Sequence, residues 1–177
     1  HSRDVRSRVG VVLQDFHIFS GTILDNIRLG DPTITRDMAT TAAKTVNAHG
    51  FISSLRDGYD TRLQERGTNL SQGERQLLAF ARVLAADPEV LVLDEATASI
   101  DTETELLIQD GLEKLMADRT AILIAHRLQT IQQADKILVL QSGKVIEYGS
   151  QPELLELKGL YHTLHELQFQ DLKTVPD

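Results

Sequence analysis

The chain has 177 residues, 41% of them hydrophobic and 25% charged, which suits a single globular domain able to bury a core. Its formal net charge of −8 argues against nucleic acid as the main partner, because phosphate backbones are bound by concentrated Lys and Arg. The sequence has no cysteine, which excludes disulfides and thiolate metal sites, and its apolar runs fall far short of the about 20 residues of a membrane helix.

The first part of the chain is predicted to be one strand followed by helices. The apolar run Val9–Leu13 is typical of a buried strand. Turn residues on either side favour a short helix over Ile23–Arg28. The composition of Thr35–Leu55 is helical, and Gly50 marks a break within it.

Two capping boxes and two apolar runs follow. Ser71–Glu74 fits a capping box that opens a helix, and Thr102–Glu105 fits a second one. Glu89–Leu93 is continuously apolar after its first residue, which predicts a strand buried on both faces. Thr120–Ala125 is predicted to be another buried strand. The alternation of strands and helices indicates an α/β sheet.

The last part of the chain is predicted to be a hairpin and two helices. Ser142-Gly143 is a turn signal between the strand candidates Lys136–Leu140 and Lys144–Tyr148. Helices are expected over Pro152–Leu157 and Leu160–Gln170.

Asp94 and Glu95 follow the apolar run directly. In α/β sheets ligands bind beyond the carboxyl ends of the strands, where these acids are expected. One carboxylate can hold Mg²⁺, directly or through water, while its neighbour orients and deprotonates a water. The alternative is a strand that ends in two solvated acids.

Three further polar positions come after predicted strands or open a helix. Ser71 and Gly73 offer a hydroxyl, a close backbone approach and unpaired amides, which together suit a phosphate, although the capping box explains them equally well. His126 could donate to a phosphate oxygen or position a water, although a lone His is more often structural. Gln14 follows the first predicted strand.

Taken in order, these motifs resemble the nucleotide-binding domain of ATP-binding cassette (ABC) transporters over almost the whole chain. Phe19–Ile23 further resembles the exporter-type cassettes. The segments that carry the resemblance are Val11–Gln14 (Q-loop), Glu65–Gly67 (the segment before the signature), Leu70–Glu74 (the LSGGQ signature), Leu91–Glu95 (Walker B), Ala98–Asp101 (D-loop) and Ala125–Arg127 (H-loop).

The resemblance implies an α/β fold with a P-loop NTPase (RecA-like) core sheet, an inserted ABC α-helical subdomain, and no N-terminal strands. We expect one incomplete ATPase domain over residues 1–177. Its pieces are the core sheet (1–20 and 88–150), the helical subdomain with the signature (21–87) and the C-terminal helices (151–177).

The resemblance also implies the cofactors ATP and Mg²⁺ and a role for each site residue. Glu95 and His126 are the implied catalytic residues, as general base and γ-phosphate contact. Gln14 and Asp94 are the implied metal contacts, partly through water, and both also face the nucleotide. The remaining implied nucleotide-facing residues are Ser71, Gln72, Gly73 and Glu74 of the signature, which reach a nucleotide held by the opposing cassette, and Asp101, which shapes the contact between cassettes.

Two departures from the family pattern affect the expected activity. Gln72 stands where Gly is usual and Glu74 where Gln is usual, so the Glu74 carboxylate could repel a γ-phosphate unless the capping box engages it. No Gly-x-x-x-x-Gly-Lys-Ser/Thr loop occurs in the sequence. We therefore expect the C-terminal three-quarters of a cassette, with the Walker A loop upstream of His1, and no ATPase activity from these 177 residues alone.

The expected partners are a second cassette and a transmembrane domain fused upstream, at the cytoplasmic face of a membrane, with no nucleic acid. Two alternatives stay open. One is a catalytically incompetent module that keeps only the signature and docking surfaces. The other is a soluble ABC ATPase of DNA repair or translation, against which stand the exporter-like segment, the acidic charge and the lack of coiled-coil heptads.

Overall fold

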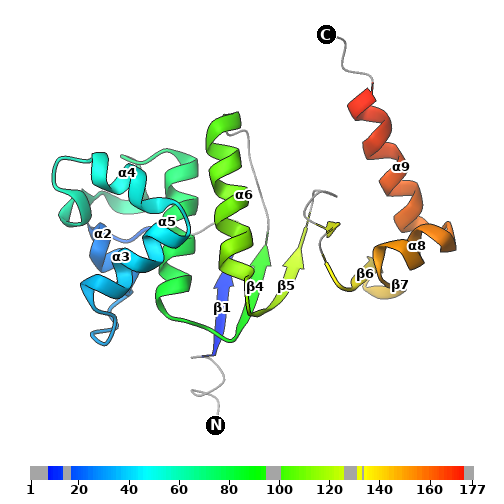
Figure 1. The fold of residues 1–177 in the computed structure, drawn as a ribbon, viewed down its shortest axis with the longest axis horizontal. Helices are drawn as coiled ribbons and strands as arrows, with labels where there is room; N and C mark the ends of the chain where they lie inside the picture. The colour runs from blue at the N-terminus through cyan, green and yellow to red at the C-terminus, as the bar shows by residue number, and fades with distance from the viewer. Residues whose placement is uncertain (1–7, 14–16, 95–100, 126–130, 133, 174–177) are drawn as a thin grey trace. The chain divides into compact units, whose positions relative to one another are not determined.

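The structure is a computed structural model that describes residues 8–13, 17–94, 101–125, 131–132 and 134–173. The chain divides into two compact units, residues 1–124 and residues 125–177 (Figure 1). Each unit is described by itself. In the residues described, no helix is both long enough and apolar enough to cross a bilayer.

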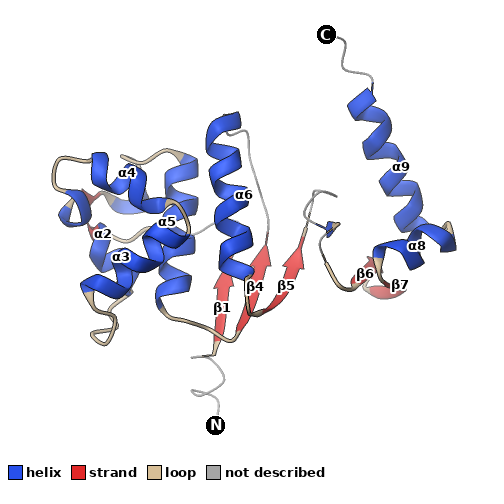
Figure 2. Cartoon of the chain, in the orientation of Figure 1, coloured by secondary structure: helices blue, strands red, loops and turns tan. Residues whose placement is uncertain are grey.

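The first unit is built on a parallel sheet of three strands, drawn in red in Figure 2. The strand order is β1-β4-β5, with β1 at Val9–Val12, β4 at Val90–Asp94 and β5 at Thr120–Ile124. Parallel neighbours need a crossover, and α6 (Thr102–Met116) supplies the one between β4 and β5. The predicted α/β fold is confirmed.

The sheet is buried on one face and open on the other. Leu91 and Leu93 of β4 are at most 3% exposed, whereas Ile122 and Ile124 of β5 are 55% and 51% exposed. Val90 and Val92, on the second face of β4, are only half-buried. The predictions of a β4 buried on both faces and a buried β5 are therefore wrong. Within the described part of the first unit, α5 (Gln72–Ala85) and α6 cover the face of Leu91 and Leu93, and no helix of that unit covers the opposite face of β5.

A helical region connects β1 to β4 (Figure 1). The predicted helix over residues 23–28 is confirmed, but the stretch from residue 35 to 55 breaks at Asn47 and not at Gly50. Asn47 adopts a left-handed conformation with φ 64°, which Asn tolerates better than most residues, and Gly50 lies inside a helix. The elements of this region are β2 (Gly21–Thr22), α2 (Ile23–Arg28), α3 (Arg36–Thr45), α4 (Ala48–Ser54), the 3₁₀ helices η1 (Gly58–Asp60) and η2 (Glu65–Gly67), β3 (Arg62–Leu63) and α5 (Gln72–Ala85).

The second unit contains the predicted hairpin and the two predicted helices. Ser142 and Gly143 both have positive φ values, 50° and 76°, as a type I′ hairpin turn requires. The buried carboxylate of Glu147 accepts hydrogen bonds from the backbone N–H groups of Leu160 (2.5 Å) and Tyr161 (3.1 Å) at the start of the last helix, α9 (Leu160–Lys173). The elements are β6 (Ile137–Gln141), β7 (Lys144–Gly149), α8 (Gln151–Leu157) and α9 (Leu160–Lys173).

Candidate functional site

Helix α5 begins with the predicted capping box. The Ser71 backbone N–H donates to Oε2 of Glu74 at 2.7 Å, and the Glu74 backbone N–H donates to Oγ of Ser71 at 3.2 Å. The Glu74 carboxylate is thus held by the cap. The Ser71 hydroxyl hydrogen and the first-turn amides of Gln72 and Gly73 have no role in the cap, because the opening amides of a helix lack intrahelical acceptors.

The first turns of α5 and α6 lie in contact, and Gly73 makes this possible. A Cβ atom at Gly73 would lie only 2.2 Å from Cγ2 of Thr104 on α6. Both helices therefore direct the positive ends of their dipoles to the same part of the first unit. Gly73 has a packing role whether or not a phosphate approaches it.

Helix α6 is capped by Asp101, one residue before the predicted cap. An Asp101 carboxylate oxygen accepts a hydrogen bond from the Thr104 backbone N–H at 2.9 Å. This bond lowers the pKa of Asp101 below its usual value. The predicted Thr102–Glu105 capping box is wrong, because Asp is the better N-cap residue and moves the helix start by one position.

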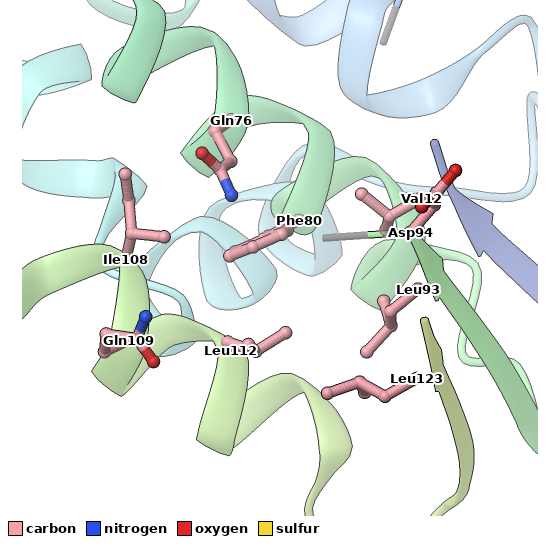
Figure 3. A pocket seen from close by; sticks show the side chains of 9 residues that line it. All are labelled: Val12, Gln76, Phe80, Leu93, Asp94, Ile108, Gln109, Leu112 and Leu123. Carbon is pink, nitrogen blue, oxygen red and sulfur yellow. The ribbon is translucent and has the colours of Figure 1, made fainter. Parts of the chain in front are cut away.

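Asp94 ends the central strand β4 and is half-buried. It lines a small cavity between the sheet and helices α5 and α6, in which Gln76 and Gln109 are the other polar side chains (Figure 3). The cavity volume of about 20 Å³ suits a single water molecule. The apolar wall consists of Val12, Phe80, Leu93, Ile108, Leu112 and Leu123.

Gln76 and Gln109 were not among the predicted site residues. Gln76 is only 8% exposed although it is polar, and it lies on the apolar side of α5. Its position one helical turn from Gly73 and Phe80, both buried, is a signal that the sequence does carry.

The described residues suit Mg²⁺ only together with other ligands. Asp94 supplies a hard carboxylate oxygen, and the described residues contain no group of three His, Cys, Asp or Glu that could hold a metal ion. Mg²⁺ is commonly held by one or two carboxylates together with waters and substrate phosphates. Asp94 therefore fits a metal that arrives with a nucleotide.

Three predicted site residues, Gln14, Glu95 and His126, lie outside the described residues, as do Ala98–Ile100 and Arg127. The strands that precede them are described. β1 precedes Gln14, β4 runs into Asp94 and Glu95, and β5 precedes His126. These strands are adjacent and parallel, so their carboxyl ends share one edge of the sheet.

Comparison with known proteins gives consistent results. The family model described as "ABC transporter" matches residues 1–98. The "Uncharacterized ABC transporter ATP-binding protein YfiC" of Bacillus subtilis is 51% identical over 94% of this chain and 28% of its own length. "Multidrug resistance protein 1" of Entamoeba histolytica is 46% identical over 93% of this chain and 13% of its own length.

A solved structure is similar over most of the chain. It is titled "Structure of a bacterial Atm1-family ABC exporter with ATP bound", with a TM-score of 0.82, 43% identity and coverage of 92% of this chain and 28% of the other. The chain therefore spans between about an eighth and 28% of the length of these relatives.

Proposed function

The chain belongs to the ABC transporter family of ATP-binding proteins, and from this premise we propose that it contributes to Mg-ATP hydrolysis that drives export across a membrane. One observation carries the proposal. Three adjacent parallel strands, β1, β4 and β5, end at one edge of the sheet. Asp94 is the last residue of β4, and Gln14, Glu95 and His126 come within two residues after the ends of the three strands.

In this proposal each residue acts by position and charge. Asp94 and Gln14 would hold Mg²⁺ that arrives with ATP, partly through water, and the ion would supply neutralisation of phosphate charge. Glu95 takes a proton from the attacking water as the water oxygen bonds to the γ-phosphorus, and the bond from that phosphorus to the bridging oxygen breaks so that ADP leaves. His126 donates a hydrogen bond to the phosphate that is transferred. Positioning and charge stabilisation account for most of the catalysis in phosphoryl transfer.

We further propose that a second cassette completes the site. The Ser71 hydroxyl and the amides of Gln72 and Gly73 face a nucleotide held by the opposing cassette, and Asp101 shapes the contact between the two. The cap that engages the Glu74 carboxylate supports this arrangement, because a carboxylate already bonded to the Ser71 amide presents less charge to a phosphate. The transmembrane partner and the place at the cytoplasmic face belong to the same proposal.

The general-base role is tested in a polypeptide in which a Walker A loop precedes residues 1–177. Glu95→Gln should keep Mg-ATP binding and slow hydrolysis by roughly 10²–10⁴-fold, the usual contribution of a positioned base. Glu89→Gln is the matched control: this acid is exposed, precedes β4 at its other end and pairs with Arg8 at 3.4 Å. Unchanged turnover in Glu95→Gln overturns the assignment.

The 177 residues alone should bind Mg-ATP weakly, because their sequence has no phosphate-binding loop while Asp94 and Glu95 contribute uncompensated negative charge. Calorimetric titration measures this directly. Micromolar affinity at a stoichiometry of one would contradict it.

A further inference from the structure

The segment between β1 and α3 is held by one buried amide side chain. Asn26 is 1% exposed, and its Oδ1 accepts a hydrogen bond from the Phe19 backbone N–H at 2.9 Å. Its Nδ2 donates to the backbone oxygens of Phe19 at 2.9 Å and Thr22 at 3.0 Å. Asn26 therefore satisfies both backbone groups of Phe19, which lies outside the strands and helices, and bonds to the backbone oxygen of Thr22 at the end of β2.

Arg82 of α5 bonds to the same segment through three nitrogens. Nε donates to the backbone oxygen of Asn26 at 2.8 Å, Nη1 to the backbone oxygen of His17 at 2.8 Å, and Nη2 to Oδ1 of Asn26 at 3.0 Å. The guanidinium carbon also lies 5.6 Å from the centroid of the Phe19 ring. The acceptors lie 56 and 65 positions away in sequence, so these bonds join distant parts of the chain.

All three acceptors of Arg82 are neutral. Burial lowers its pKa to about 10, so the guanidinium is still charged at neutral pH. Burying a charge costs free energy unless its N–H donors find acceptors. The three hydrogen bonds of Arg82 provide such acceptors. The planar guanidinium can serve three acceptors at once, whereas a lysine ammonium cannot reproduce that geometry.

We infer that Arg82 is a positioning residue that makes segment 17–28 and helix α5 move as one body. This rests on the proposed function, because Ser71 caps α5 and segment 17–28 follows Gln14, and that function assigns both residues to the nucleotide. In this inference, Arg82 makes no contact of its own with nucleotide or metal. Arg82 acts through Asn26 and Phe19, so that a displacement of segment 17–28 also displaces α5.

Amide hydrogen exchange on the 177-residue chain tests this inference without nucleotide. Arg82→Lys keeps the positive charge but removes the planar guanidinium with its three hydrogen bonds. The backbone amides of residues 19–28 should then exchange about tenfold faster or more, while the amides of α5 and β4 keep their exchange rates. Arg75→Lys is the matched control on the same helix, because Arg75 makes one long hydrogen bond, 3.5 Å to the backbone oxygen of Gly67.

The pattern of exchange separates positioning from general stability. If Arg82 only stabilised the fold, Arg82→Lys would accelerate segment 17–28, α5 and β4 by the same factor, and that result overturns the inference. Unchanged exchange at Phe19 also overturns it. Asn26→Ala is the second variant: it removes the Oδ1 atom that accepts from Arg82 Nη2 and from the Phe19 amide but leaves the two backbone acceptors of Arg82, and it should also accelerate exchange at Phe19. ATPase activity does not enter the measurement, so the outcome is independent of the test of Glu95.

Discussion

Both faces of the three-stranded sheet carry apolar side chains, but the two faces have different environments. On one face Leu91 and Leu93 are packed under α5 and α6, and on the other Ile122 and Ile124 are about half exposed. The strands carry apolar residues on both faces, so the sequence pattern alone predicts burial on both. The apolar residues of a strand show which of its faces could be buried. Which face is in fact buried depends on where the helices pack.

The largest expected effect is a direct comparison of the two faces. Leu91→Ala should reduce the free energy of unfolding by about 2–5 kcal/mol, because Leu91 is 0% exposed and the truncation leaves a cavity. Ile122→Ala removes a similar apolar side chain from the open face and should cost less than about 1 kcal/mol. Urea unfolding followed by circular dichroism measures both. Equal losses would mean that the open face is also packed in solution.

The next largest effect is expected at the contact between α5 and α6, the two helices that cover the packed face of the sheet. Gly73→Ala should destabilise the chain by about 1–3 kcal/mol, because the new methyl group meets Thr104 on α6. Gly50→Ala is the control inside α4, with no atom within 4 Å of the added Cβ, and should stabilise by up to about 1 kcal/mol.

Adding Thr104→Ser to Gly73→Ala removes Cγ2 of residue 104, the methyl group that the new Cβ would contact. The double variant should recover most of the loss, which unfolding measurements on the four proteins of the cycle would detect. If the two substitutions change the free energy of unfolding additively, the side chains at positions 73 and 104 do not contact each other.

A smaller effect is expected from the α5 cap. Ser71→Ala removes the oxygen that accepts from the Glu74 amide and should cost about 1 kcal/mol. Ser53→Ala, in α4, loses a hydrogen bond to the Gly50 backbone oxygen at an exposed position and should change stability by less than about 0.5 kcal/mol. Thermal unfolding of the two variants compares them, and a larger loss in Ser53→Ala would argue against the cap.

The smallest effect is a pH dependence at the α6 cap. The folded pKa of Asp101 lies below its usual value of 3.8, so the charged cap contributes stability above about that pH. The contribution is lost as the pH falls through the lower, folded value. Asp101→Asn keeps a good cap that does not titrate. The difference in unfolding midpoint between the natural chain and Asp101→Asn should therefore stay constant above about pH 5 and shrink as the pH falls below about 3.8. A difference that does not shrink at low pH would contradict the assignment.

Local chemistry made some elements predictable. The Ser71–Glu74 capping box and the hairpin turn at Ser142-Gly143 are formed by residues within a few positions of each other, and both were predicted correctly. The start of α6 was misplaced by one residue because Asp101 and Thr102 are both acceptable caps. The break at Asn47 was missed because Gly is the more usual signal.

Contacts between distant residues were not predictable in the same way. Asp94 was predicted from the strand it ends, but Gln76 and Gln109, which line the same cavity, come from two helices whose packing no local pattern specifies. The hydrogen-bonded pair Arg82 and Asn26 is likewise not predictable from local sequence patterns, because the two residues are 56 positions apart.

The sequence by itself determined the order of motifs, the family they resemble and the segments able to form strands, helices and caps, because these depend on neighbouring residues. Only the tertiary structure decided which sheet face is covered, why Gly73 must lack a side chain and where Arg82 finds its acceptors. Those outcomes depend on close packing between elements far apart in the chain, where a single methyl group or guanidinium meets atoms that its own neighbours in sequence do not specify.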